Sequence, residues 1–108
     1  MPFEQLRSEL KGVNFDTLRL DCDNRFEAVI VKDELQKLVS RLELFFGSPA
    51  WPSQNRLSFQ ARQLIEGFGG IMQGQTLYLR DAGKDTVFAM LWPWQDGLHT
   101  TVKVVKPV

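Results

Sequence analysis

The chain has 108 residues, of which 44% are apolar and 24% charged, and its formal net charge is zero. This composition is typical of one folded domain, and it excludes a disordered chain and the basic surface of most nucleic-acid-binding proteins. A single cysteine excludes an intramolecular disulfide, and one cysteine with one histidine cannot supply the usual four ligands of a zinc site.

The sequence also carries no signal for a membrane. No apolar run reaches the roughly 18 residues that a membrane-spanning helix needs, and the first residues lack the apolar core of a signal peptide. We therefore expect a single cytoplasmic α+β domain of bacterial type over residues 1–108. We expect it not to bind a membrane.

The first predicted element is a short helix over residues 2–11. Phe3, Leu6 and Leu10 recur at helical spacing, and Gly12 is a plausible stop. A helix this short is marginal in water, so it must dock on another element, most simply a sheet face.

A β-hairpin is expected next. Residues 16–22 alternate in polarity and place Leu18, Leu20 and Cys22 on one face, which we expect to be buried. An Asp-Asn turn pair follows, and the alternation resumes over residues 25–31. A competing interpretation starts the next helix inside this second strand.

Residues 33–46 give the strongest helical pattern in the chain. Asp33 is the predicted N-cap, with Gln36 three residues on completing a capping box, and Gly47 is the predicted residue just beyond the helix. One apolar stripe runs along this helix and predicts a wall of the core: Leu35, Leu38, Val39, Leu42, Phe45 and Phe46.

Two prolines predict a rigid connector over residues 48–53. A second amphipathic helix is predicted over residues 55–68, and a glycine-rich joint over residues 67–74 leads out of it. This joint matches neither the dinucleotide-binding pattern nor the Walker A pattern, so it predicts no phosphate site. We expect no cofactor and no metal.

Residues 75–105 predict a three-stranded antiparallel meander, around which the chain is organised. Its strands span 75–80, 86–92 and 98–105, with turns at 81–85 and at a Gln-Asp-Gly sequence. The middle strand is apolar on both faces and should therefore be covered on both sides. Pro93 lacks an N–H, which predicts that the ladder fails or bulges just after Trp92.

The predicted order is therefore α-β-β-α-α-β-β-β. It describes an α+β domain with a short N-terminal helix, a β-hairpin, two amphipathic helices and a three-stranded antiparallel meander. About five strands form the sheet, and the helices pack on one face.

Aromatic side chains of the meander are the predicted binding site. Tyr and Trp combine a large apolar area with a polar tip, which favours interfaces. We expect a small non-catalytic interaction domain that binds a protein partner, itself as a homodimer, or a small apolar ligand. We expect no nucleic-acid partner, and stacking of single-stranded nucleic acid is the weakest hypothesis, because no basic cluster accompanies the aromatic residues. The predicted binding residues are Tyr78, Phe88, Met90, Trp92 and Trp94, of which the first four should share a face.

Two alternatives remain open. The N-terminal helix could cover the aromatic face and turn it into a second core. The chain could instead be a small enzyme, with His99 as an acid–base group beside Asp96 or Asp81, or with Cys22 as a nucleophile activated by His99. A pocket that holds His99 and a carboxylate would favour the enzyme.

Overall fold

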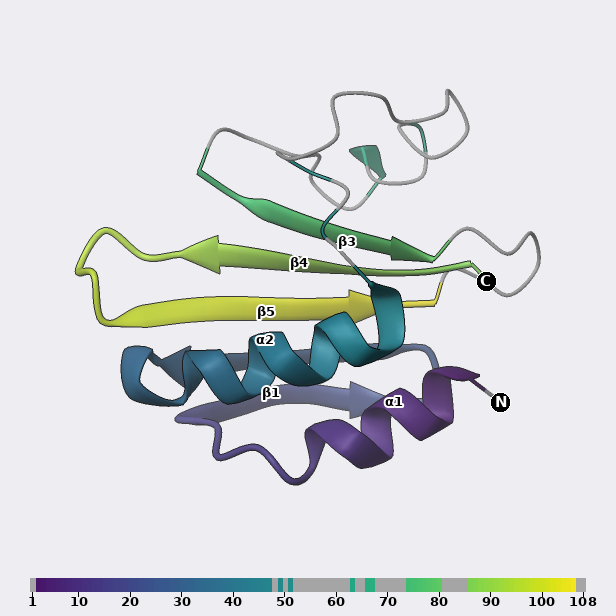
Figure 1. Cartoon of the computed structure of the whole chain (residues 1–108), viewed down its shortest axis with the longest axis horizontal. Helices are drawn as coiled ribbons and strands as arrows, with labels where there is room; N and C mark the ends of the chain where they lie inside the picture. Colours follow the sequence, from purple (N-terminus) through teal and green to yellow (C-terminus); the bar gives the residue numbers. More distant parts are fainter. Residues whose placement is uncertain are drawn as a thin grey trace.

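The computed structural model describes residues 2–47, 74–80 and 86–106, together with residues 49, 51, 63, 66 and 67. The predicted α+β class and the sheet of about five strands are confirmed, and the structure has a five-stranded antiparallel sheet (Figure 1). In chain order the elements are α1 (Pro2–Leu10), β1 (Thr17–Cys22), β2 (Arg25–Val31), α2 (Lys32–Phe46), β3 (Thr76–Arg80), β4 (Val87–Pro93) and β5 (His99–Val105).

Several predicted segments lie largely outside the described residues. These are the connector at 48–53, the glycine-rich joint and the turn at 81–85. Of the predicted helix at 55–68, Gln63 and Glu66 are described with helical backbone, together with Gly67, whose N–H donates to the Gln63 carbonyl.

The five strands follow the order β1-β2-β5-β4-β3, and all neighbours are antiparallel. Strand β5 is therefore the centre of the sheet, with the hairpin β1–β2 on one side and β4–β3 on the other. Strand β4 is also interior, and its residues from Val87 to Leu91 are all buried. The prediction that this apolar strand is covered on both sides is confirmed.

The predicted break after Trp92 is wrong, because β4 continues through Pro93, which pairs with Thr100 of β5. The Trp94 amide donates to the His99 carbonyl at 2.8 Å. Hydrogen-bonded and non-bonded pairs alternate in an antiparallel ladder, so Pro93 falls at a non-bonded pair. Its missing N–H therefore costs no hydrogen bond to β5.

Both helices pack on one face of the sheet, as Figure 1 shows. Leu38 and Leu42 of α2 are fully buried, and the other four members of its predicted stripe pack around them. Helix α1 buries its own predicted stripe against the same core. The sheet side chains beneath the helices come from four strands: Phe26, Ala28, Ile30, Tyr78, Val87, Ala89, Leu91, Val102 and Val104.

Helix α2 begins at Lys32, directly after β2, so the predicted N-cap at Asp33 is wrong. Val31 occupies the N-cap position, and no side chain caps the helix. The Lys32 amide instead donates to the Leu98 carbonyl at 2.8 Å, so the turn before β5 satisfies an amide at the start of the helix. At the other end, Gly47 has the predicted positive φ, and its amide bonds to the Glu43 carbonyl.

A β-bulge in β1 changes the predicted face of the first hairpin. The register shifts between Leu18 and Leu20, so these two side chains lie on opposite faces. Leu18 is 57% exposed and Leu20 38%, which contradicts their predicted burial. The shift turns Asp21 toward the helices, where the Arg7 side chain donates to it at 2.7 Å.

The contrast between two neighbouring leucines of α2 tests this packing. Leu42 is fully buried, whereas Leu44 is 88% exposed. We expect Leu42→Ala to lower the free energy of unfolding by about 2–5 kcal/mol, because it leaves a cavity in the core. Leu44→Ala should change it by less than about 0.5 kcal/mol. Urea denaturation of both variants checks this, and equal losses would contradict the assigned burial.

Candidate functional site

The sheet register separates the predicted aromatic residues onto two faces. Tyr78 pairs with Ala89, and Leu79 pairs with Phe88, so Tyr78 lies on the helical face and Phe88 on the other. The prediction that Tyr78 shares a face with Phe88, Met90 and Trp92 is therefore wrong. Side chains alternate with a period of two, so a register that differs by one residue moves every side chain to the other face.

Tyr78 belongs to the core under the helices. It is 2% exposed, its ring centroid lies 5.9 Å from that of Phe46, and its hydroxyl donates to a carboxylate oxygen of Glu43 at 3.4 Å. Burial first, and then the negative charge of Glu43, raise the pKa of Tyr78 to about 12. A side chain in this position stabilises the fold and does not present a binding surface.

Phe88 and Met90 form a second core on the opposite face. Both are completely buried, together with Leu77 and Val105, and Trp51 packs against them. Trp51 also extends the sheet beyond β3, because its backbone exchanges two hydrogen bonds with Leu77 at 3.3 and 3.2 Å. The alternative that the N-terminal helix covers this aromatic face is therefore wrong, because α1 packs on the other face of the sheet.

Trp92 lies half-buried at the margin of this second core. The Lys103 ammonium is 4.6 Å from its ring centroid, a cation–π contact, and 3.5 Å from a carboxylate oxygen of Glu27. Glu27 in turn lies 3.9 Å from Arg19. A row of alternating charges therefore crosses this face from β1 to β5.

Trp94 is the one predicted binding residue that is both exposed and held in place. It is 40% exposed, and its indole N–H donates to the Thr101 hydroxyl at 2.8 Å. Its ring packs on His99 with centroids 4.8 Å apart, and the Arg19 guanidinium lies 6.0 Å from the ring. We call Trp94, His99 and Arg19 the Trp94 surface.

His99 is fixed by carboxylates on both sides of its ring. Its Nδ1 lies 2.6 Å from Asp96, and its Nε2 lies 3.8 Å from Asp16. The other Asp96 oxygen accepts the backbone amides of Leu98 and His99 at 2.8 and 3.0 Å. The Leu98 amide is the largest cause that lowers the pKa of Asp96, followed by the His99 side chain.

Of the predicted catalytic pairs, only His99 with Asp96 is formed in the described part of the chain. Asp81 lies outside the described residues. Cys22 pairs with Arg25 at one end of β2, whereas His99 pairs with Val31 at the other end, so the proposed thiol–imidazole contact is wrong. The Cys22 thiol contacts the side chain of Asn24 instead, and Cys22 is half-buried.

The His99–Asp96 pair has a structural role that is visible in its contacts. Asp96 closes the turn between β4 and β5, and His99 supports the ring of Trp94. The Thr101 hydroxyl accepts the hydrogen bond of the Trp94 indole. The arrangement therefore holds an exposed indole rigidly, which is what a binding residue needs.

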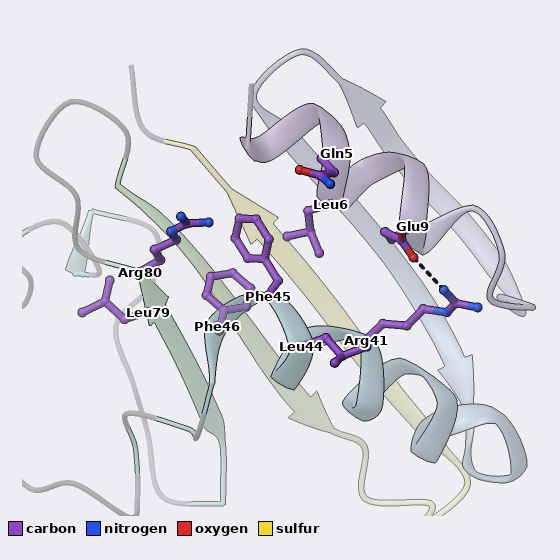
Figure 2. Close-up of a pocket in the computed structure, with 9 residues that line it drawn as sticks. All are labelled: Gln5, Leu6, Glu9, Arg41, Leu44, Phe45, Phe46, Leu79 and Arg80. Carbon is purple, nitrogen blue, oxygen red and sulfur yellow. Dashed lines mark hydrogen bonds and ion pairs between the residues drawn. The ribbon is translucent and has the colours of Figure 1, made fainter.

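A cavity lies on the helical side of the molecule, away from these residues (Figure 2). None of the predicted site residues that the structure describes lines it. Phe45 and Phe46 were predicted only as core. Arg41 and Arg80 carried no signal, because residues this far apart in the sequence line one cavity only through the tertiary structure.

Comparison of the chain with models of protein families, with curated proteins and with solved structures finds no significant match. Among the described residues, no helix combines the length and the apolar character that a membrane-spanning segment requires.

The single tyrosine of the chain makes the burial of Tyr78 directly measurable. Its pKa is raised from 10.0 to about 12 in the folded protein, so between these values the unfolded chain releases a proton that the folded chain retains. We expect the contribution of Tyr78 to the free energy of unfolding to be fully present below this window and to be lost as the pH rises through it.

Near-ultraviolet absorbance of the phenolate should titrate near pH 12 in the folded protein and near pH 10 in denaturant. The Tyr78→Phe variant should lose the tyrosine contribution to the fall in stability, which separates it from the titration of lysines. A folded-state midpoint at the ordinary value would show that Tyr78 is open to water.

Proposed function

We propose that this chain is a small, non-catalytic cytoplasmic interaction domain, and that a second polypeptide docks on the Trp94 surface. The observation that carries the proposal is an indole that is 40% exposed yet held by Thr101, His99 and Arg19. Tryptophan and arginine are the residues most enriched among those that dominate interface energies. An indole that is already ordered loses little side-chain entropy on binding.

The surroundings of this surface also suit a protein partner. Arg19, Glu27 and Lys103 provide both signs of charge beside the aromatic residues, as in the polar rim of an interface. The formal net charge of zero favours neither nucleic acid nor an anionic membrane. A second copy of the chain is one polypeptide that this surface could accept, and the experiment below separates it from another protein.

An enzyme that uses His99 and Asp96 is the second candidate, and the 2.6 Å contact between them supports it. We rank it lower because the same Asp96 also bonds two turn amides, so its position is explained by the fold. The two proposals separate experimentally. His99→Gln in an enzyme would abolish turnover while substrate still binds, whereas Trp94→Ala in an interaction domain abolishes binding.

We expect Trp94→Ala to weaken partner binding by roughly 30-fold or more, the effect of losing a dominant interface residue of about 2 kcal/mol. Quantitative affinity purification should compare this variant with the wild type and with Leu44→Ala, an exposed leucine on the helical side. Light scattering over a dilution series of the same proteins distinguishes self-association. If Trp94→Ala retains every partner and the oligomeric state of the wild type, the proposal is wrong.

A further inference from the structure

A cavity of about 610 Å³ lies between α1, the C-terminal turn of α2 and the end of β3. Its size falls within the range of roughly 300–1,000 Å³ that is usual for small-molecule sites. Helix α1 contributes Gln5, Leu6 and Glu9, and β3 contributes Leu79 and Arg80. The remaining lining side chains come from α2: Arg41, Leu44, Phe45 and Phe46.

Apolar side chains form much of the wall. Leu6 is buried beneath α1, and the rings of Phe45 and Phe46 meet edge to face with centroids 4.7 Å apart. Leu44 lines the cavity while 88% of its surface remains exposed, which makes it an apolar group that a ligand could cover. An apolar body in the cavity would remove this surface from water.

Charge is distributed unevenly along the cavity. In Figure 2 the two phenyl rings lie between Arg80 on one side and the Glu9–Arg41 pair on the other. Arg41 donates to Glu9 at 2.9 Å, so these two charges offset each other and tie α2 to α1. The Arg80 guanidinium lies 5.0 Å from the Phe45 ring centroid.

Arg80 carries the charge that this ion pair does not offset. None of the ion pairs within the described ranges includes it. Among the lining residues that the structure describes, two guanidinium groups and one carboxylate give one net positive charge. A guanidinium presents paired N–H donors that match a carboxylate in two parallel hydrogen bonds.

We propose that this cavity binds a small carboxylic acid with an apolar body, such as a medium-chain acyl or aryl carboxylate. The carboxylate sits at Arg80, and the apolar body lies against Phe45, Phe46 and Leu44. A single negative charge balances the single net positive charge of the lining. This site is independent of the Trp94 surface, because none of its lining residues contributes to that surface.

Calorimetric titration of the full chain with sodium decanoate below its micelle concentration tests the proposal. Decyltrimethylammonium, with the same chain and the opposite charge, is the matched ligand control. We expect saturable binding of one decanoate per chain and at least about tenfold weaker binding of the cation, because only the carboxylate can accept charge-assisted hydrogen bonds from the Arg80 guanidinium. No decanoate binding, or equal binding of both ligands, would overturn the proposal.

Two pairs of variants test where the ligand binds. Arg80→Gln removes the charge and keeps much of the side chain, and Leu44→Glu adds a repelling charge to the exposed wall. Each should weaken decanoate binding about tenfold or more. Arg19→Gln and Leu98→Glu change an exposed arginine and an exposed leucine outside the cavity, and should leave binding unchanged.

Circular dichroism and urea denaturation confirm that each variant is folded before its affinity is compared. Arg80→Lys provides a second readout, because it keeps the charge and loses the paired geometry, so its affinity should lie between those of the wild type and Arg80→Gln. Unchanged affinity in folded Arg80→Gln, or an equal loss in the Arg19→Gln control, would overturn the assignment of the carboxylate to Arg80.

Discussion

The antiparallel pairing of β5 with β2 is the interaction on which the rest of the described structure depends. It joins the N-terminal hairpin to the C-terminal strands along the whole length of both, from Arg25 opposite Val105 to Val31 opposite His99. The register brings the turn before β5 against the start of α2, where Lys32 bonds to Leu98, and brings His99 to Asp16. The same ladder therefore fixes the sheet, the start of the principal helix and the support of Trp94.

The two faces of this sheet have different roles. Under the helices, the apolar stripes of α1 and α2 pack on the sheet and form a continuous core. Tyr78 is buried in this core, and its hydroxyl donates a hydrogen bond to Glu43. On the opposite face, Phe88 and Met90 lie in a smaller core beside Trp51. Trp92 and Trp94 on that face remain partly open to water and are held by polar groups: Trp92 contacts the Lys103 ammonium, and Trp94, at the β4–β5 turn, bonds to Thr101. Exposure combined with rigidity is why we assign binding to Trp94 and not to the buried aromatic residues.

The cavity on the helical side depends on how α1 and α2 are spaced. Arg41 bridges to Glu9, and Gly12 leaves room for this bridge, since a Cβ atom there would lie 3.3 Å from the Arg41 guanidinium. Phe45 and Phe46 follow the last buried leucine of α2, so they extend past the core and meet β3 at its end. The two proposed sites thus occupy opposite sides of the sheet, and a change at one can be made without touching the other.

The sequence by itself determined the elements that the structure describes, because local periodicity and turn chemistry report directly on them. The stripe of α2, the positive φ of Gly47 and the hairpin turn at Gly97 follow from local pattern. The sequence did not determine on which face of the sheet each side chain lies. The bulge at Leu18–Leu20 and the register of Leu79 with Phe88 depend on partner strands, and each reassigns side chains between core and surface. The tertiary structure also decided the sites. It separated His99 from Cys22 and brought Arg80 to Phe45, because only the packing of distant segments sets which of their side chains meet.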